Sequence, residues 1–364
     1  DLDALGIDRS KMRFPKATEY IAEQIALVEK LFKKGYAYHI GDGVYFDTSK
    51  FPTYGELGGV STAAMQAGAR VEENTEKRNP HDFALWKLSN PDEKREQEWS
   101  SPWGVGFPGW HIECTAMIFT LLGKQIDIHT GGIEHIPVHH NNEIAQAEAA
   151  SGKRFAQHWL HYDHITIEGK KISKSLGNTV YLRNIIDKGI NPRALRYWFL
   201  TAHYRSPANF TWDALEGASV ALARLTRMYF EFPDNGKPDQ SFLQNFYKAI
   251  ANDLDTPNAL AQVWDFVKVD GKYKKVSLAN KKATLAIVDT LLGLGFSEAR
   301  PSSKLVVLEE SDLPSEVQDF MTERAHARQS KDFAKADELR KKIEELGFEV
   351  KDTSDGPELT RKTS

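Results

Sequence analysis

A predicted helix, a short β-branched strand and a second predicted helix follow one another in the middle of the chain, and this alternation constrains the fold most. Apolar spacing predicts helices over residues 112–122 and 139–150. Residues 126–129 contain two β-branched isoleucines and precede a Gly-Gly pair, which predicts a strand. This alternation is typical of half of a doubly wound α/β sheet, whose strands deliver side chains to a cleft at their carboxyl ends.

The segments on either side of this α/β region have different patterns. Toward the amino end we expect a helix over residues 18–34, a strand at residues 44–46 and a loop over residues 55–80. After Trp212 the pattern becomes mostly helical, with predicted amphipathic helices over residues 214–230, 242–252, 259–267 and 279–292. Residues 301–303 indicate a linker before a helix pair over residues 314–330 and 332–346, and the polar tail from Asp352 is expected to be less ordered.

Length and composition exclude several classes of protein. With 364 residues, two to four units are expected, and 41% hydrophobic and 27% charged residues are typical of a globular protein. We find no apolar run long enough for a membrane span and no signal-peptide pattern. Because Cys114 is the only cysteine, an internal disulfide is excluded, which is consistent with a cytoplasmic location.

The net charge of −4 does not indicate a nucleic-acid partner, but local charge is uneven. Two segments are rich in basic residues, and each is either a solvated helix face or a surface that contacts RNA. Their members are Lys268, Lys272, Lys274, Lys275, Lys281 and Lys282 in one segment, and Lys331, Lys335, Arg340, Lys341 and Lys342 in the other.

His139 and Glu143 are four residues apart, so on a helix their side chains share one face and can converge on one cation. Cys114 can supply a thiolate, and zinc accepts sulfur, nitrogen and oxygen donors in tetrahedral sites. The alternative from spacing alone is a surface pair on a helix and a buried apolar cysteine.

The run from Lys171 to Ser175 places two ammoniums and two hydroxyls in a loop flanked by glycines. Lys171 and Lys174 carry flexible point charges, and Ser173 and Ser175 add small donors, a combination that suits a triphosphate. A solvated basic turn is the alternative when this loop is considered alone.

This run, with Ile172 in its second position, resembles the lysine-containing KMSKS signature of class I aminoacyl-tRNA synthetases. Residues 108–117, 127–132 and 139–146 resemble the amino-acid pocket of the cysteinyl-tRNA synthetase family, in the expected order. The resemblance implies a partial doubly wound, Rossmann-like class I catalytic domain, followed by a helical bundle and a carboxyl-terminal helix pair.

The resemblance also implies roles for individual residues. Cys114, His139 and Glu143 match the second, third and fourth zinc ligands of the family, and His140 would orient its neighbour. Substrate-binding positions are Trp110, which would wall the pocket, His129, which would orient the amino acid or the metal environment, and Gly131 with Gly132. Zn²⁺ would bind the thiolate of cysteine directly, which discriminates against serine because a neutral alcohol is a poorer zinc donor.

The implied reaction activates cysteine with ATP and Mg²⁺ to cysteinyl-adenylate and then transfers cysteine to tRNA(Cys). Lys171 and Lys174 are the implied catalytic residues, acting on the departing pyrophosphate, and Ser173 and Ser175 complete the ATP-binding group. Residues 195–210 match a family segment that could guide the acceptor stem, and the helical regions resemble the part that recognises the anticodon.

We find neither an HIGH-type motif nor a first zinc-ligand cysteine, so we expect a chain that begins inside the insertion of the catalytic domain. Such a chain would be weakly active or inactive alone, would need an amino-terminal segment in trans, and would be a monomer. We divide the chain into five parts. Residues 1–100 are the remainder of the insertion, residues 101–165 the second catalytic half, and residues 166–213 the lysine loop with the stem-contact region. Residues 214–300 form the helical bundle, and residues 301–364 the helix pair with its tail.

Two other functions remain open from the sequence. A related cysteine ligase would pass the activated amino acid to an aminosugar, although the helical carboxyl-terminal part disfavours this alternative. A truncated, non-catalytic module for tRNA binding is the second alternative. Retention of Lys171, Lys174 and the three metal-ligand candidates favours an origin in catalysis.

Overall fold

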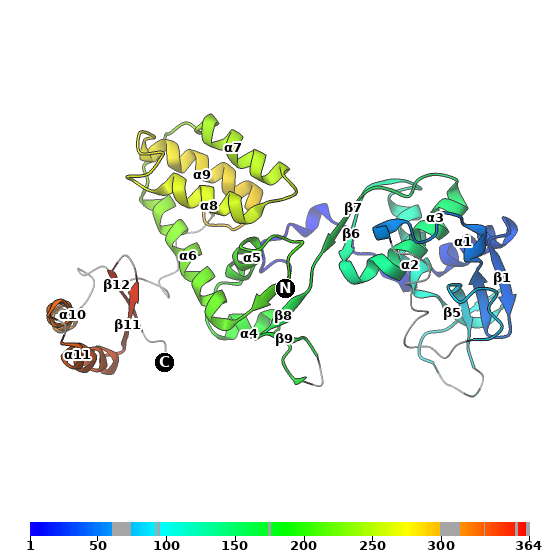
Figure 1. Ribbon diagram of the computed structural model, residues 1–364, viewed down its shortest axis with the longest axis horizontal. Helices are drawn as coiled ribbons and strands as arrows, with labels where there is room; N and C mark the ends of the chain where they lie inside the picture. Colours follow the sequence, from blue (N-terminus) through cyan, green and yellow to red (C-terminus); the bar gives the residue numbers. More distant parts are fainter. Residues whose placement is uncertain are drawn as a thin grey trace. The chain divides into compact units, whose positions relative to one another are not determined.

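The computed structural model describes residues 1–59, 74–90, 92, 95–173, 176–298, 314–330, 332–353 and 356–361. The chain forms two compact units (Figure 1). Unit 2 contains residues 10–166 and 204–208, and unit 1 contains residues 1–9, 167–203 and 209–364. Each unit is described by itself below.

Unit 2 contains an antiparallel five-stranded sheet with the order β1-β2-β3-β5-β4. Its strands are β1 (Ala37–Ile40), β2 (Gly43–Phe46), β3 (Phe83–Leu88), β4 (Trp99–Ser101) and β5 (Gly104–Pro108). The predicted strand at residues 44–46 is confirmed as β2, whereas the other four strands were not predicted. Short 3-10 turns lie at Arg9–Lys11, Ala17–Glu19, Thr48–Lys50 and Leu57–Gly59, and residues 60–73 of the predicted loop lie outside the described residues.

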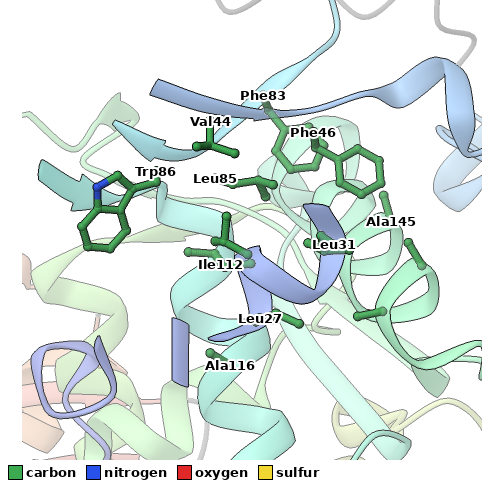
Figure 2. Close-up of a cluster of buried hydrophobic side chains, with 13 residues drawn as sticks. Leu27, Leu31, Val44, Phe46, Phe83, Leu85, Trp86, Ile112, Ala116 and Ala145 are labelled. Carbon is green, nitrogen blue, oxygen red and sulfur yellow. The ribbon is translucent and has the colours of Figure 1, made fainter. Parts of the chain in front are cut away.

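Three helices contribute to the core of this unit, namely α1 (Ile21–Lys33), α2 (Trp110–Leu121) and α3 (Asn141–Ser151). Leu31 of α1 and Ile112 of α2 are fully buried with Phe46 and Trp86 of the sheet (Figure 2). Burying such large apolar side chains is the main favourable contribution to the stability of the unit. The helices predicted over residues 18–34 and 112–122 are confirmed.

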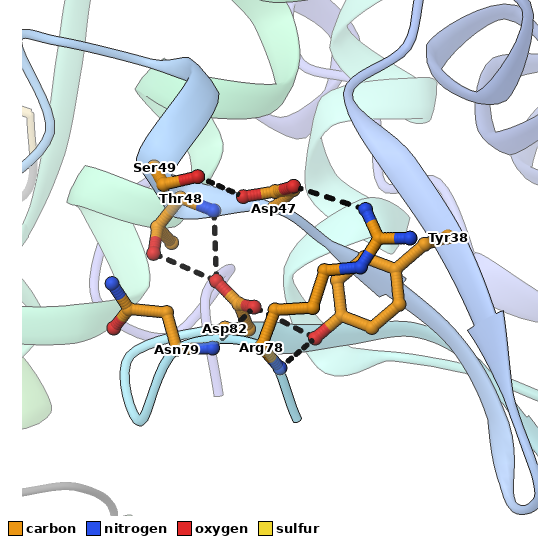
Figure 3. Close-up of polar contacts among 7 residues, drawn as sticks. All are labelled: Tyr38, Asp47, Thr48, Ser49, Arg78, Asn79 and Asp82. Carbon is orange, nitrogen blue, oxygen red and sulfur yellow. Dashed lines mark hydrogen bonds and ion pairs between the residues drawn. The ribbon is translucent and has the colours of Figure 1, made fainter. Parts of the chain in front are cut away.

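The carboxylate of Asp82, 2% exposed, fixes the segment that leads into β3 (Figure 3). It accepts hydrogen bonds from the Tyr38 hydroxyl at 2.7 Å and from the Thr48 N–H and hydroxyl at 2.8 and 2.7 Å. The Asn79 N–H donates to the same carboxylate at 3.0 Å, and the Arg78 guanidinium lies 4.2 Å from the centroid of the Tyr38 ring. Because these donors satisfy the buried carboxylate, it joins the turn after β2 to the start of β3.

A parallel pair of strands, β6 (Ile126–Gly132) and β7 (Ala156–Tyr162), completes the unit, with Ile126 opposite Ala156. The predicted strand over residues 126–129 is confirmed and extends to the Gly-Gly pair. The chain then forms a 3-10 turn (Ile133–His135), a π-helical turn (Ile136–His140) and α3. The predicted helix over residues 139–150 therefore begins with a π-helical turn that contains His139. The mixed α/β fold class is confirmed.

A three-stranded sheet with the order β10-β8-β9 lies where the chain enters unit 1. Its strands are β8 (Ile165–Ile167), β9 (Lys170–Lys171) and β10 (Ala208–Phe210), and the helices between β9 and β10 are α4 (Leu182–Asp187) and α5 (Pro192–Leu200). Four longer helices follow, namely α6 (Trp212–Glu231), α7 (Gln240–Ala251), α8 (Thr256–Val267) and α9 (Leu278–Leu292). All four were predicted.

The bundle helices begin where side-chain oxygens cap the first turn. Each cap accepts a hydrogen bond from a backbone N–H of the new helix, which satisfies a donor that the helix leaves unpaired. The four caps are Thr211, Asp239, Asp255 and Ser277. Inside the bundle, Phe242 of α7 and Phe266 of α8 are fully buried and stack at a centroid distance of 4.0 Å.

The carboxyl-terminal part contains α10 (Ser315–Gln329), α11 (Phe333–Glu345), β11 (Phe348–Thr353) and β12 (Gly356–Arg361). The predicted helix pair is confirmed. Where a less ordered tail from Asp352 was predicted, the structure has strands up to residues 353 and 361, and residues 354, 355 and 362–364 lie outside the described residues. β11 and β12 form an antiparallel hairpin, because Phe348, Val350 and Leu359 bury their side chains in one cluster with Ile343 of α11. The predicted linker at residues 301–303 lies outside the described residues. Among the described residues, none of the helices combines the length and apolar composition that a membrane span requires.

Candidate functional site

Three side chains from separate elements of unit 2 bring sulfur, nitrogen and oxygen donors together. Cys114 lies on α2, His139 in the π-helical turn and Glu143 on α3. Their donor atoms all lie within 4.8 Å of one another. His139 and Glu143 are buried, at 5% and 0% exposure, and Cys114 is half-buried. The structure thus brings together the three residues that the sequence analysis selected as metal ligands.

A second group of donors shares Glu143. His129 on β6 and His140 in the π-helical turn have ring nitrogens that lie with the Glu143 carboxylate inside the same 4.8 Å limit. The His129 Nε2 atom is 2.8 Å from Glu143 Oε2. His129 therefore holds one carboxylate oxygen in place, which leaves the other oxygen for the Cys114 group.

The carboxylate of Glu143 offers a direct test of whether the first group fits a metal ion. Its Oε1 atom is buried and lies 3.3 Å from His139 Nε2, but it accepts no hydrogen bond from any residue that the structure describes. A buried carboxylate beside a thiol and an imidazole is costly to hold charged, and a bound cation would offset that cost. Zinc lies about 2.0–2.3 Å from its donors, so the donors of one ion are at most about 4.6 Å apart. Donors of tetrahedral zinc lie roughly 3.3–3.8 Å apart, so a bound ion would draw this group, which lies within 4.8 Å, closer together.

Burial and charge set the protonation of this group. Burial, together with the nearby Glu143 carboxylate, raises the pKa of the Cys114 thiol to about 12. Burial opposes ionisation of Glu143, but contacts from His129 and His139 outweigh it and lower the pKa of that carboxyl to about 2. The protein alone thus provides one fixed negative charge and one neutral thiol, which a bound cation would convert to a thiolate.

Further imidazoles surround the ligand candidates. His111 Nδ1 lies 2.8 Å from His139 Nδ1, so the nitrogen of His139 that faces away from Glu143 has a partner. His140 Nδ1 lies 2.7 Å from His161 Nε2 on β7. Burial lowers the pKa of both His111 and His140 to about 3, so these rings are neutral at neutral pH. Such partners orient metal-ligating histidines.

His111 and His161 had no predicted role. His111 lies in segment 108–117, which resembles the amino-acid pocket of the family. Its place in that segment was the only feature of the sequence that could have pointed to a role. His161 reaches the site because β7 pairs with β6, and local spacing does not reveal this pairing.

The predicted substrate-binding residues lie around the same donors. The indole of Trp110 is 57% exposed, and its ring centroid is 4.2 Å from that of His139. A Cβ atom at Gly131 would lie 2.6 Å from His140 Cε1, so this strand approaches the imidazole too closely for any other residue. At Gly132, a Cβ atom would meet the Glu134 carboxylate at 2.1 Å.

The lysine-signature loop belongs to unit 1. Lys171 ends β9 and is exposed. The Ser173 N–H donates to Asn178 Oδ1 at 2.9 Å, and Asn178 Nδ2 donates to the Lys171 carbonyl at 3.0 Å. Asn178, which was given no role from the sequence, therefore ties the two ends of the loop together. Lys174 and Ser175 lie outside the described residues.

Comparisons with known proteins cover almost the whole chain. Residues 1–220 match the family model described as the tRNA synthetases class I (C) catalytic domain, and residues 310–357 match the cysteinyl-tRNA ligase anticodon binding domain. Cysteine–tRNA ligase 1 of Burkholderia lata is 46% identical over 345 residues, covering 94% of this chain and 71% of the relative. Cysteine–tRNA ligase of Chlorobaculum tepidum is 39% identical over 375 residues, covering 100% and 76%. A cysteine–tRNA ligase of Thermus thermophilus is 40% identical over 369 residues, covering 98% and 76%.

Proposed function

Because the chain belongs to the cysteine–tRNA ligase family of class I aminoacyl-tRNA ligases, we propose that its buried donor group selects cysteine through zinc for ATP-dependent activation and transfer to tRNA(Cys). The family membership agrees with the resemblance found in the sequence. The observation that carries the proposal for this site is the gathering of three different donor types, sulfur, nitrogen and oxygen, around the buried carboxylate of Glu143.

Cys114, His139 and Glu143 would hold the zinc ion. When bound, zinc would supply a Lewis-acidic centre with a position open to substrate, as catalytic zinc sites do. A thiolate is a much stronger donor to zinc than a neutral hydroxyl, so cysteine is favoured over serine by bond strength. Discrimination by the small size difference between the two side chains alone would be much weaker.

The surrounding residues position this group. His129 holds Glu143 Oε2, and His111 lies against the outer nitrogen of His139, so the donors are oriented before substrate arrives. Trp110 covers His139 with an exposed ring and would form the wall that the substrate meets. Gly131 and Gly132 would let the amino acid approach the strand backbone.

Activation joins a cysteine carboxylate oxygen to the α-phosphorus of ATP, while the bond from that phosphorus to the bridging oxygen breaks and pyrophosphate leaves. Lys171 and Lys174 would stabilise the charge on the leaving pyrophosphate, with Ser173 and Ser175 as further contacts to ATP and with Mg²⁺ on the phosphates. A terminal hydroxyl of tRNA(Cys) then attacks the acyl carbon, and AMP leaves. The Asn178 contacts support a loop held closed at its base.

The acceptor in this proposal is transfer RNA rather than an aminosugar. The matched anticodon-binding region at residues 310–357 supports this choice. The partners would therefore be tRNA(Cys), cysteine and ATP, and the proposed location is the cytoplasm.

Cobalt substitution tests the metal and the thiol together. Co²⁺ added to the purified chain is expected to give a sulfur-to-metal charge-transfer band, which Cys114→Ala removes and Glu113→Gln leaves unchanged. Glu113 is a half-buried carboxylate beside Cys114 that is not part of the donor group, so it is a matched control. L-cysteine should increase the band and L-serine should not. Equal spectra with the two amino acids would overturn the proposed selection.

A further inference from the structure

Two side-chain hydrogen bonds join α2 to the segment that carries His139 and Glu143, and one of them has no role in the chemistry described above. The first is the contact of His111 with His139. In the second, the Thr115 hydroxyl on α2 donates to Gln146 Oε1 on α3 at 2.9 Å. Thr115 and Gln146 are both fully buried. Burial shields such a bond from competing water and strengthens it.

Both members of this second bond lie next to metal-ligand candidates. Thr115 directly follows Cys114 on α2. Gln146 lies three residues after Glu143, so these two side chains share one face of α3. The bond therefore ties the turn of α2 that carries the sulfur to the turn of α3 that carries the carboxylate. His111 lies one turn before Thr115, so Cys114 stands between the two contacts along the chain.

The apolar contacts between these helices do less to set their register. Ala116 of α2 belongs to the same core cluster as Ala145 and Ala149 of α3. Methyl groups allow two helices to approach closely, but each contact is weak and has no preferred direction. A hydrogen bond, in contrast, needs a particular distance and angle. The bond between Thr115 and Gln146 therefore limits how far α2 can shift along α3, and with it the distance from the sulfur to the carboxylate.

Stability of the fold does not explain a glutamine at this place. The Nε2 atom of Gln146 is buried and has no hydrogen-bond partner among the residues that the structure describes. An unpaired buried donor lowers the stability of a fold, and an apolar side chain of the same shape avoids this loss. What the glutamine adds over an apolar residue is its contact with Thr115.

We propose that Thr115 and Gln146 are positioning residues that hold the Cys114 sulfur against the Glu143 carboxylate, an inference that rests on the proposed function. They act through the helices that carry the donors and set the spacing of the donors before a metal ion arrives. Donors that are already gathered lose less conformational freedom on binding, which raises their affinity for the ion. Loss of the bond should therefore weaken metal binding more than it weakens the metal-free fold.

Gln146→Met separates these two effects. Methionine keeps the length of the side chain and removes both polar atoms of the amide, so that it leaves no unpaired donor of its own. The Thr115 hydroxyl keeps the His111 carbonyl, 3.2 Å away, as an acceptor. The urea midpoint of the metal-free chain should not fall. Zinc affinity, measured by competition with a chromophoric chelator, should fall about 10–100-fold, as for other contacts that orient metal ligands.

Variants of Thr115 test the other end of the bond. Thr115→Val has nearly the same shape without the hydroxyl and should lower zinc affinity by the same factor. Thr115→Ser keeps the hydroxyl and should bind zinc as the wild-type chain does. The double variant, Thr115→Val with Gln146→Met, should lose no more affinity than the larger of the two single losses, because both side chains act through one bond.

Thr120→Val is the matched control, since it makes the same substitution on the same helix. The Thr120 hydroxyl donates to the Ala116 carbonyl at 2.9 Å, so its removal breaks a bond within α2. Zinc affinity of this variant should equal that of the wild-type chain.

The inference is wrong if Gln146→Met and Thr115→Val bind zinc as tightly as the wild-type chain, or if their losses add in the double variant. It is also wrong if Gln146→Met loses zinc affinity together with a lower urea midpoint, since that result marks a structural role. A loss in Thr120→Val as large as that in Thr115→Val would overturn it as well, because any hydroxyl of α2 would then have the same effect.

The outcomes separate this inference from the proposed function. Zinc binding that neither variant weakens sinks the positioning role and keeps the proposed function. Zinc binding that both variants weaken, without any preference for L-cysteine over L-serine in the cobalt spectra, supports the positioning role and contradicts the proposed selection. A wild-type chain that binds no zinc overturns both.

Discussion

The metal-donor group of unit 2 and the core of the helical bundle in unit 1 are held together in different ways. Glu143 and His139 are almost fully buried, and they reach one another from a π-helical turn and the helix that follows it. Phe242 and Phe266 of the bundle are fully buried as well, and their rings stack on one another. A soft metal site needs dry, oriented donors, whereas the burial of apolar rings has no preferred direction. Under the proposed function, the amino acid would be bound by the buried donors of unit 2.

The largest expected effect tests whether these two regions unfold independently. Phe266→Ala removes a fully buried ring that stacks on Phe242, and it should lower the free energy of unfolding of the bundle by about 3–5 kcal/mol. Hydrogen exchange resolved by peptide should show lost protection in α7 and α8. Protection in α2 and α3 should remain, because these helices belong to the other unit.

Phe333→Ala serves as the control, since this ring is 60% exposed and its loss should change stability by no more than about 0.5 kcal/mol. If α2 and α3 lose protection together with the bundle in the Phe266 variant, the two units unfold as one and the comparison fails.

The second effect in size tests the buried donors themselves. Glu143→Gln keeps the shape of the side chain and removes the charge that faces Cys114 and His139. Loss of an outer contact to a metal ligand costs about 10–100-fold in affinity, so loss of a ligand oxygen should cost at least about 100-fold. Competition with a chromophoric chelator measures the zinc affinity of the variant and of the wild-type chain.

Glu113→Gln again provides the matched control, because it removes a carboxylate from the same unit outside the donor group. Its zinc affinity should equal that of the wild-type chain. Equal losses in the two variants would mean that general charge, and not coordination by Glu143, governs metal binding.

The sequence predicted the helical regions better than the sheets, for a physical reason. Helix periodicity and caps such as Asp239 and Ser277 are local, so α6 to α9 follow from short stretches of sequence. The five-stranded sheet depends on pairs far apart in the chain, such as Trp86 with Pro108, and its strands are short. The β12 strand was missed because its apolar residue, Leu359, is isolated among polar neighbours.

The same limit applies to the donor group. The spacing of His139 and Glu143 predicted a shared face, although His139 lies in a π-helical turn instead of the regular helix. The contact of His129 with Glu143 joins β6 to α3, and that of His140 with His161 joins the π-helical turn to β7, so neither could be read from local spacing.

The third prediction tests whether any buried carboxylate of unit 2 affects zinc affinity, or whether some affect only stability. Asp82 is about as buried as His139 and Glu143, but its oxygens are satisfied by Tyr38, Thr48 and Asn79. Asp82→Ala should leave these donors unpaired and lower the free energy of unfolding by about 1–3 kcal/mol, with zinc affinity unchanged. Urea unfolding and the chelator competition measure the two quantities. Asp127→Ala, at an exposed position on β6, is the control, and a loss of zinc affinity in the Asp82 variant would contradict the distinction.

The smallest expected effect concerns the ion pair between Asp42 and Lys87 on the five-stranded sheet, whose side chains are neither buried nor fully exposed. Burial opposes ionisation of Asp42, but hydrogen bonds and charge from Lys87 outweigh it and lower the pKa of the carboxyl. The unfolded chain therefore binds a proton more readily than the folded one, so this contribution is present above about pH 3.9 and is lost as the pH falls further. Because both side chains are partly exposed, it should amount to about 0.2–1 kcal/mol. Urea unfolding of the wild-type chain and of Asp42→Asn, measured between pH 6 and pH 3, should show the difference between them shrinking on acidification. A difference that stays constant across this range would mean that the Asp42 charge adds nothing and that the burial of its neighbours alone stabilises this edge of the sheet.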